Sequence, residues 1–278
     1  MIRSEGRFNR MRTFLINLAR RPDRLYAMTA QLSDLGLPAQ VVPAVDAMKV
    51  SDDEANRRFA ASGPLGPLPK GDKCCTLSHM RAWQMLLDSG DSRALILEDD
   101  VHLDPDGARL LQDLSWIAPS IGLVKIEHYG PESQRVLVDE LVDVGCGRQL
   151  GRLLSRHTGA AAYIISRETA ERLLGWPNPW TLPVDHMLFN LNNSPLAATL
   201  RPYQLTPAIA RQTDAIGGAT DIDHWRAELR TGGWSYLRRE LVRAYYELRL
   251  LPRQIASLLR RDSGFVRVEA PRKLPVGH

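Results

Sequence analysis

One stretch of the sequence constrains the fold more than any other, because four apolar residues run directly into three acids. It reads Ala94-Leu95-Ile96-Leu97-Glu98-Asp99-Asp100-Val101. A short continuous apolar run predicts a strand that is buried on both faces, as in a parallel sheet covered by helices. The acids then fall at the carboxyl end of this strand, the edge where open α/β sheets bind ligands.

The three adjacent carboxylates repel one another, and burying them unpaired beside a core is costly. A divalent cation would remove this cost, and carboxylate oxygens suit hard cations such as Mg²⁺ or Mn²⁺. Such an ion commonly completes its coordination with water and substrate phosphates. Glu98, Asp99 and Asp100 therefore indicate a metal–diphosphate site, with a solvated acidic turn as the alternative.

The residues before this stretch predict a β-α-β order. An apolar first strand covers residues 13–18, and a helix with Pro in its first turn covers 22–35. A second short strand follows at 41–42. This order predicts a parallel sheet, and Arg20, Arg21 and Arg24 beside the helix start indicate either an anion cradle or ordinary surface arginines.

Residues 47–72 are polar and then rich in Gly and Pro, which predicts a mobile loop. Thr76 is a favoured N-cap residue, so the next helix is expected over 77–87. His79 lies in the first turn of this helix, where it can be a structural hydrogen-bonding group or part of the site.

Composition excludes several classes of protein. Among the 278 residues there is no run of 18 apolar residues and no apolar signal sequence at the N-terminus. The three cysteines fit neither a disulfide framework nor a zinc motif, which indicates reduced thiols and a cytoplasmic protein. No nucleic-acid-binding motif accompanies the basic residues, so we expect no nucleic-acid partner.

The C-terminal segment differs in character from the rest. Residues 223–262 predict a helical extension with an apolar stripe and many arginines, interrupted at Pro252. Such a basic amphipathic helix can lie on the anionic inner face of the cytoplasmic membrane, or it can pack its stripe on the catalytic domain. Residues 1–11 and 263–278 are expected to be flexible tails.

Several motifs resemble glycosyltransferase family 25, the bacterial lipopolysaccharide or lipooligosaccharide transferases related to animal collagen galactosyltransferases. The resemblance covers about residues 12–222. It rests on Ile16-Asn17-Leu18-x-Arg20-Arg21-Pro22-Asp23-Arg24, Pro43-Ala44-Val45-Asp46, Cys75-x-Leu77-Ser78-His79-x-x-Ala82-Trp83, Leu95-x-Leu97-Glu98-Asp99-Asp100-Val101, His157-Thr158-Gly159-Ala160, Pro183-x-Asp185, Gln212 and Thr220-Asp221-Ile222. The chain departs from the family at Lys73-Cys74-Cys75, where a glycine is expected before the second cysteine.

The resemblance implies a GT-A-like, single Rossmann-type domain with a mainly parallel sheet flanked by helices. It also implies an inverting transfer from a nucleotide sugar, with UDP-galactose as the best-known donor and Mn²⁺ or Mg²⁺ at the acidic motif. The acceptor would be a hydroxyl of a bacterial surface glycan or glycolipid. The residues expected at the donor are Asn17, Arg20, Arg24, Ala44, Asp46, Lys73, His79 and Gln212.

Inverting transfer requires a general base facing the acceptor hydroxyl. Asp185 is the first candidate, because a carboxylate at a helix N-terminus stays ionised, although Asp also caps helices for structural reasons. Glu127 is the second candidate, followed by His186 and His157, of which His157 is expected to line the sugar or acceptor pocket. Gln212 either approaches the donor phosphate or ends a strand.

Two other functions compete with this interpretation. A nucleotidyltransferase would show a glycine-rich phosphate loop after the first strand, where this chain has Asn17-Leu18-Ala19-Arg20-Arg21-Pro22. A catalytically inactive relative could serve as a membrane-associated glycan-binding or scaffold protein, but the acids at 98–100 and 185 are intact.

Overall fold

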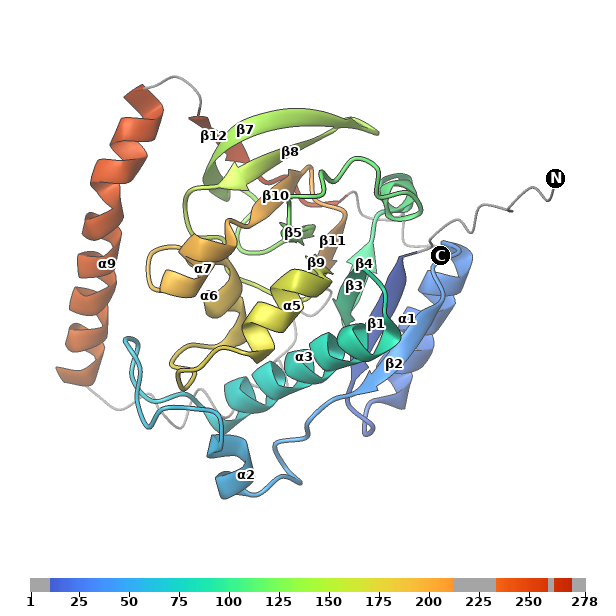
Figure 1. Ribbon diagram of the computed structural model, residues 1–278, viewed down its shortest axis with the longest axis horizontal. Coiled ribbons are helices and arrows are strands. Elements are labelled where there is room, and N and C mark those ends of the chain that lie inside the picture. Colours follow the sequence, from blue (N-terminus) through green and yellow to red (C-terminus); the bar gives the residue numbers. More distant parts are fainter. Residues whose placement is uncertain (1–10, 213–233, 260–262, 272–278) are drawn as a thin grey trace.

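The computed structural model describes residues 11–212, 234–259 and 263–271. Figure 1 shows a central twisted sheet with helices on both faces. Its nine strands follow the order β12-β7-β8-β10-β5-β9-β3-β1-β2, and a second sheet has the order β4-β11-β6. The predicted α/β class is therefore confirmed.

The elements have the following bounds. The described helices are α1 (Pro22–Asp34), α2 (Asp52–Asn56), α3 (Lys70–Ser89), α4 (Pro105–Ala108), the 3-10 helix η1 (Arg109–Leu111), α5 (Arg167–Leu174), α6 (Val184–Phe189), α7 (Pro195–Leu200) and α9 (Trp234–Leu259). The described strands are β1 (Arg12–Asn17), β2 (Ala39–Pro43), β3 (Arg93–Glu98), β4 (Val101–Leu103), β5 (Leu123–Lys125), β6 (Glu127–His128), β7 (Arg135–Gly145), β8 (Arg148–Leu153), β9 (Ala162–Ser166), β10 (Tyr203–Thr206), β11 (Ala210–Gln212) and β12 (Ser263–Arg267).

The three strands predicted from apolar runs form the parallel part of the sheet. β1 lies between β2 and β3, with Asn17 opposite Pro43 and Ile16 opposite Glu98. The interior residues of β3 are fully buried, as expected for a strand covered on both faces. The carboxyl ends of β1, β2 and β3 therefore meet at one edge.

The rest of the sheet corrects the expectation of mainly parallel strands. Only β1–β2, β1–β3 and β5–β10 are parallel, whereas the other five neighbouring pairs are antiparallel. The reason is connectivity: β7 and β8 form a hairpin, and β9 runs between β3 and β5 in the opposite direction. Antiparallel strands need only short connections, whereas parallel neighbours need crossovers.

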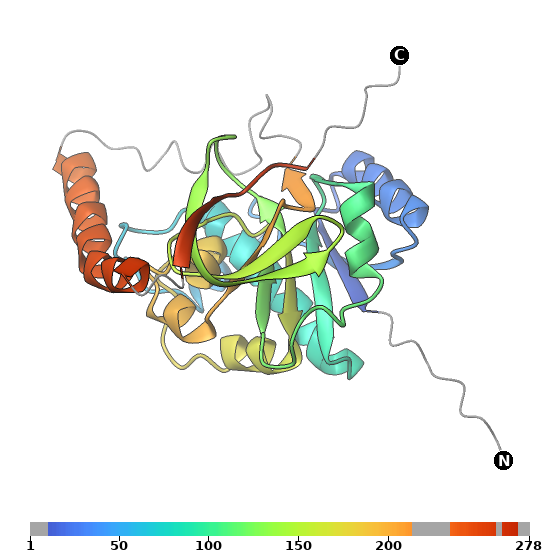
Figure 2. The same cartoon turned by 90° about the horizontal axis from the view of Figure 1, so that it is seen from above.

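Two apolar clusters hold the layers together on opposite faces of the sheet. One joins β1 and β3 to α3, α5, α6 and α7, and it includes the fully buried Trp83 and Phe189. The other joins the sheet to α1 and the η1 region, and it includes Met28, Leu32 and Leu111. Figure 2, seen from above, shows the helices on the two faces.

The helix expected over residues 77–87 starts earlier than predicted. The predicted helix start and the predicted loop over residues 47–72 are therefore both wrong. α3 begins at Lys70 after Pro69, and the preceding segment contains α2 as well as loops. Thr76 does not cap, because its hydroxyl donates to the carbonyl of Asp72 one turn back inside the helix. The helix ends at Gly90, whose φ of 79° is the left-handed C-cap conformation.

The C-terminal segment also differs from expectation. α9 continues through Pro252. Proline has no N–H to donate to the carbonyl of Leu248 one turn back, and Leu248 is 63% exposed to water. Residues 263–267 are not a loose tail, since β12 pairs antiparallel with β7 and Val268 is fully buried. No helix among the described residues combines the length and apolarity needed to cross a bilayer.

Candidate functional site

The acidic motif lies at the edge where β1, β2 and β3 end. Glu98 is the last residue of β3, and Asp99 and Asp100 form the turn into β4. Asp99 accepts hydrogen bonds from Asn17 Nδ2 at 2.6 Å and from Arg24 at 3.2 Å. These contacts tie the motif to the last residue of β1 and to the first turn of α1.

Asp100 is a largely buried acid with a raised pKa. Its side chain is 9% exposed, and burial together with the charge of Glu98 raises its pKa from 3.8 to about 7, opposed by Arg24 at 3.5 Å. Gln212 Nε2 lies 3.3 Å from both Asp100 Oδ1 and Glu98 Oε2 and donates to them. β11 brings Gln212 here, because it pairs with β4 with Gln212 opposite Val101.

The ends of β1 and β2 bring a second group of predicted residues to the same edge. The backbone N–H of Ala44 donates to the carbonyl of Asn17 at 2.9 Å. Arg20 pairs with Asp46 at 3.4 Å, and the Arg20 side chain remains 34% exposed. The residues predicted to hold the nucleotide are thus adjacent along this edge, next to the acidic motif.

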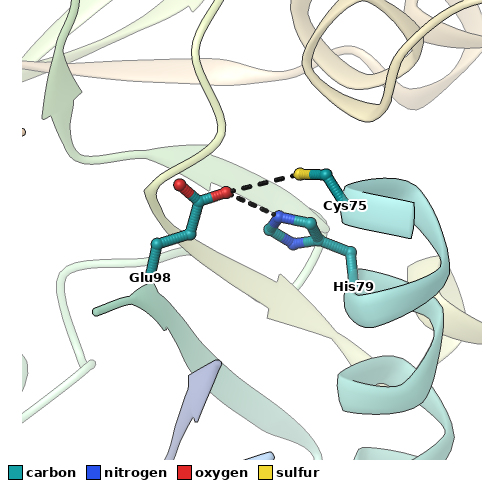
Figure 3. Close-up of side chains that lie close together, drawn as sticks. All are labelled: Cys75, His79 and Glu98. Atoms are coloured by element: carbon teal, nitrogen blue, oxygen red, sulfur yellow. Dashed lines mark hydrogen bonds and ion pairs between the residues drawn. The ribbon is translucent and has the colours of Figure 1, made fainter. Parts of the chain in front are cut away.

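Helix α3 approaches the motif with two side chains one turn apart. Cys75 Sγ and His79 Nε2 lie 3.7 Å and 3.1 Å from the same oxygen, Oε1, of Glu98 (Figure 3). His79 is fully buried, and its Nδ1 lies 2.9 Å from the hydroxyl of Tyr163. Trp83 Nε1 donates to that hydroxyl at 2.8 Å, so the position of the imidazole is fixed from behind.

Asp185 lies in the first turn of α6, one residue inside the helix, and Pro183 occupies the N-cap position. Its Oδ2 accepts the backbone N–H of Gly159 at 3.2 Å. Gly159 has a φ of 90°, and a Cβ there would lie 2.8 Å from Tyr129. Only glycine fits this close approach, which explains one position of the His157-Thr158-Gly159 motif.

Glu127, the second candidate base, is fully buried as the partner of Lys125. Its Oε2 accepts from Lys125 Nζ at 2.7 Å and from the backbone N–H of Ala161 at 3.0 Å. Burial raises the pKa of Glu127, and the charge of Lys125 opposes the shift. Lys125 also donates to the carbonyl of Gly159, so this ion pair supports the backbone segment that contacts Asp185.

The two histidine candidates occupy structural positions. His157 is buried between the side chain of Gln204 and the carbonyl of Tyr129, and burial lowers its pKa to about 3, which keeps the ring neutral. His186 contacts Asn190 through Nδ1 at 2.9 Å, one turn along its own helix.

Lys73 is the predicted donor-binding residue that the structure places apart from the acids. Its Nζ donates to Asn56 Oδ1 at 2.6 Å and so faces α2. Cys75 and Tyr163 were not among the predicted site residues. The i, i+4 spacing of Cys75 and His79 was the available signal, whereas Tyr163 comes from a distant strand.

The donor atoms at the acidic motif fit a hard divalent cation. Oxygens of Glu98 and Asp100 are the ligand type that Mg²⁺ and Mn²⁺ prefer. Arg24 pairs with both Asp99 and Asp100, so one guanidinium faces two carboxylates beside Glu98. A divalent cation would add positive charge to this cluster.

Comparisons with known proteins identify the family of the chain. The model of "Glycosyltransferase family 25 (LPS biosynthesis protein)" matches residues 11–188. The chain therefore belongs to glycosyltransferase family 25. Family membership makes it a glycosyltransferase, which confirms the predicted enzyme class.

The individual relatives have similar sequence identities to this chain. Lacto-N-neotetraose biosynthesis glycosyltransferase LgtE of Neisseria meningitidis is 29% identical over 217 residues, covering 73% of this chain and 74% of that protein. Lipooligosaccharide biosynthesis protein lic2B of Haemophilus influenzae is 25% identical, covering 72% and 75%. Procollagen galactosyltransferase 1 of Danio rerio is 30% identical, covering 63% of this chain but only 30% of that longer protein.

Proposed function

We propose that this chain is an inverting, metal-dependent glycosyltransferase. It transfers a hexose, with galactose favoured, from a UDP-sugar to a hydroxyl of a bacterial surface glycan such as lipopolysaccharide. The observation that carries this proposal is the cluster of three carboxylates, Glu98, Asp99 and the largely buried Asp100, at the edge where β1, β2 and β3 end. The relatives that act in lipooligosaccharide and lacto-N-neotetraose biosynthesis support this acceptor class.

Each side of the site has a separate role in this proposal. Glu98 and Asp100 would hold Mn²⁺ or Mg²⁺, which supplies Lewis-acid stabilisation of the diphosphate leaving group when bound. Asn17 and Arg24 hold Asp99 and thereby orient the acidic turn. Arg20 and Asp46, which pair with each other after the ends of β1 and β2, would bind the nucleotide.

Asp185 is the proposed general base. Its carboxylate is held by the N–H of Gly159 and lies in the first turn of a helix, where the helix dipole favours the ionised form that a base requires. Glu127 is less suitable, because it is fully buried and already engaged by Lys125. We expect Asp185→Asn to lower kcat by about 10²–10⁴-fold, with UDP-sugar binding unchanged.

The test is a thermal-shift screen of nucleotide sugars with and without Mn²⁺, followed by a transfer assay with the donor that binds. A ligand specific for the folded state adds about 2.7 kcal/mol of stability at a hundredfold excess over its Kd. We expect one UDP-sugar to shift the melt only when Mn²⁺ is present, and Asp100→Asn to abolish the shift. Asp106→Asn, at an exposed acid nearby in sequence, is the matched control. If no nucleotide sugar shifts the melt under either condition, the inactive-scaffold alternative replaces this proposal.

We further propose that the enzyme acts in the cytoplasm with α9 on the anionic face of the membrane. The helix exposes a stripe of large apolar side chains at helical spacing, comprising Leu241, Tyr245, Leu248, Ile255 and Leu259, which are 52–78% exposed. Its sequence contains five Arg and two Glu. An apolar stripe with basic residues suits an anionic bilayer surface, where a lipid-anchored acceptor would lie.

Vesicle sedimentation tests this placement. We expect binding to vesicles that contain anionic lipid, weaker binding to neutral vesicles, and loss of binding in the variant Leu241→Ser/Leu248→Ser. Tyr26→Ser removes a side chain that is 79% exposed on α1 and serves as the control. Equal binding by the stripe variant and the unsubstituted chain would assign the stripe to another partner.

A further inference from the structure

The two oxygens of Glu98 face different sets of neighbours. Oε2 lies on the side of Asp100, since Gln212 Nε2 donates to both residues at 3.3 Å. Oε1 instead lies toward α3, near a thiol and an imidazole (Figure 3). The function proposed above uses only the first side, which has oxygen donors alone.

The second side has the donor set of a softer metal. We propose that Cys75 Sγ, His79 Nε2 and Glu98 Oε1 form a binding site for a thiophilic divalent cation such as Zn²⁺, distinct from the hard-cation site at Asp100. A thiolate, an imidazole and a carboxylate together are common zinc ligands, and three protein ligands leave one position for water.

The distances fit this assignment. Zn²⁺ binds sulfur at about 2.3 Å and nitrogen or oxygen at about 2.0–2.2 Å, so tetrahedral coordination places the donors about 3.4–3.6 Å apart. Here the S–O and N–O separations are 3.7 Å and 3.1 Å, and all three donor atoms lie within 4.8 Å of one another. The two measured separations therefore lie within about 0.3 Å of those expected in a tetrahedral site.

The surroundings of His79 are those of a metal-binding histidine. When Nε2 binds an ion, the ring hydrogen lies on Nδ1 and is donated to the Tyr163 hydroxyl, 2.9 Å away. Trp83 holds this hydroxyl in turn. Coordination also requires the thiolate of Cys75, whose proton is released to solvent on binding.

The ion would balance the charge on this side of Glu98. The carboxylates of Glu98, Asp72 and Asp185 all act electrostatically on Cys75. A bound cation would place positive charge between the thiolate and Glu98. Glu98 is shared with the hard-cation site, so we expect Zn²⁺ to raise the Mn²⁺ concentration needed for donor binding.

A cobalt titration of the full chain tests the site directly. Co²⁺ bound to a thiolate gives a near-ultraviolet charge-transfer band, and we expect this band to saturate at one equivalent and to disappear when Zn²⁺ is added. Cys75→Ser should lose it. The double variant Cys74→Ala/Cys146→Ser is the matched control and should keep it, because Cys74 packs in a separate apolar cluster and Cys146 is exposed on a hairpin turn.

Melting temperatures with and without Zn²⁺ distinguish a variant that has lost Zn²⁺ binding from one that has misfolded. Cys75→Ser should unfold cooperatively near the unsubstituted chain but lose most of its Zn²⁺-dependent shift, and Tyr163→Phe should weaken Zn²⁺ binding by about 10–100-fold. A missing band in the unsubstituted chain, or a band that survives in Cys75→Ser, overturns the proposal. This readout needs no transfer activity, so it stands or falls separately from the proposed function.

Discussion

Removing the charge of Asp100 should make the metal-free protein more stable at alkaline pH while it destroys metal-dependent donor binding. Burial and Glu98 raise the Asp100 pKa from 3.8 to about 7, so the folded state holds this proton more tightly than the unfolded chain does. Between these values the folded state binds more protons, and the free energy of unfolding therefore falls as pH rises. The substitution Asp100→Asn removes this dependence.

The magnitude follows from the two pKa values. The full cost above pH 7 is about 4 kcal/mol at most, because each pH unit corresponds to about 1.36 kcal/mol. Between pH 5 and pH 8, the linkage relation gives a loss of about 2–3 kcal/mol in the free energy of unfolding, which the variant does not share. In a chain of this size, that corresponds to a difference in Tm of about 5–10 °C.

The assay is thermal unfolding in a chelator at pH 5, 6, 7 and 8, followed by the same series in Mn²⁺. Comparing the variant with the unsubstituted chain at two pH values cancels fixed costs of the amide, such as its altered contact with Arg24 at 3.5 Å. We expect the Tm of the variant, relative to that of the unsubstituted chain, to rise from pH 5 to pH 8. Mn²⁺ should stabilise only the unsubstituted chain, because the variant lacks the Asp100 carboxylate that is proposed to bind the ion.

Asp106→Asn is the control, because this acid is exposed and should show no pH-dependent gain. The reasoning is refuted if Asp100→Asn lowers stability by the same amount at pH 5 and pH 8. That result would mean that ionising Asp100 costs the folded state no free energy relative to the unfolded chain. The carboxylate would then need no cation.

Two substitutions, each with a matched comparison variant, probe the support around the site. Gly159→Ala should cost about 1–3 kcal/mol and reduce kcat, because φ is 90° and the new Cβ would lie 2.8 Å from Tyr129. Gly90→Ala has a similar φ of 79° but open space, so it should cost about 1 kcal/mol and leave activity unchanged. Lys125→Met should cost about 3–5 kcal/mol in urea unfolding, because it leaves Glu127 charged and buried, whereas Lys125→Met/Glu127→Leu should recover much of the loss. A double variant no more stable than Lys125→Met would contradict the ion-pair account.

The sequence predicted the strands that are buried on both faces, and with them the acidic edge. β1 and β3 contain continuous apolar runs, at residues 14–16 and 94–97, and this signal depends only on neighbouring residues. β12 was missed for the opposite reason. Its pattern Ser263–Arg267 is short and partly exposed, and it becomes a strand only because β7 offers a free edge.

Helix phase decided which predicted site residues came together. Lys73 was expected at the donor, but it precedes Cys75 by two residues, which is about 200° around a helix. When Cys75 and His79 face Glu98, Lys73 must face away, toward Asn56 on α2. The expected helix start at Thr76 put Lys73 in the preceding loop and concealed this constraint.

The direction of β9 determines whether the proposed base reaches the acidic edge. β9 pairs antiparallel with β3, with Ala162 opposite Leu97, so the chain enters β9 at the edge where β3 ends. The carbonyl of Ala161 accepts the N–H of Glu98 there at 2.9 Å, two residues after Gly159. In the mainly parallel sheet expected from the sequence, β9 would begin at the opposite edge, about 16 Å away for a five-residue strand. The contact between Gly159 and Asp185 could not then form beside the acids, so the reversed strand is a requirement for this site.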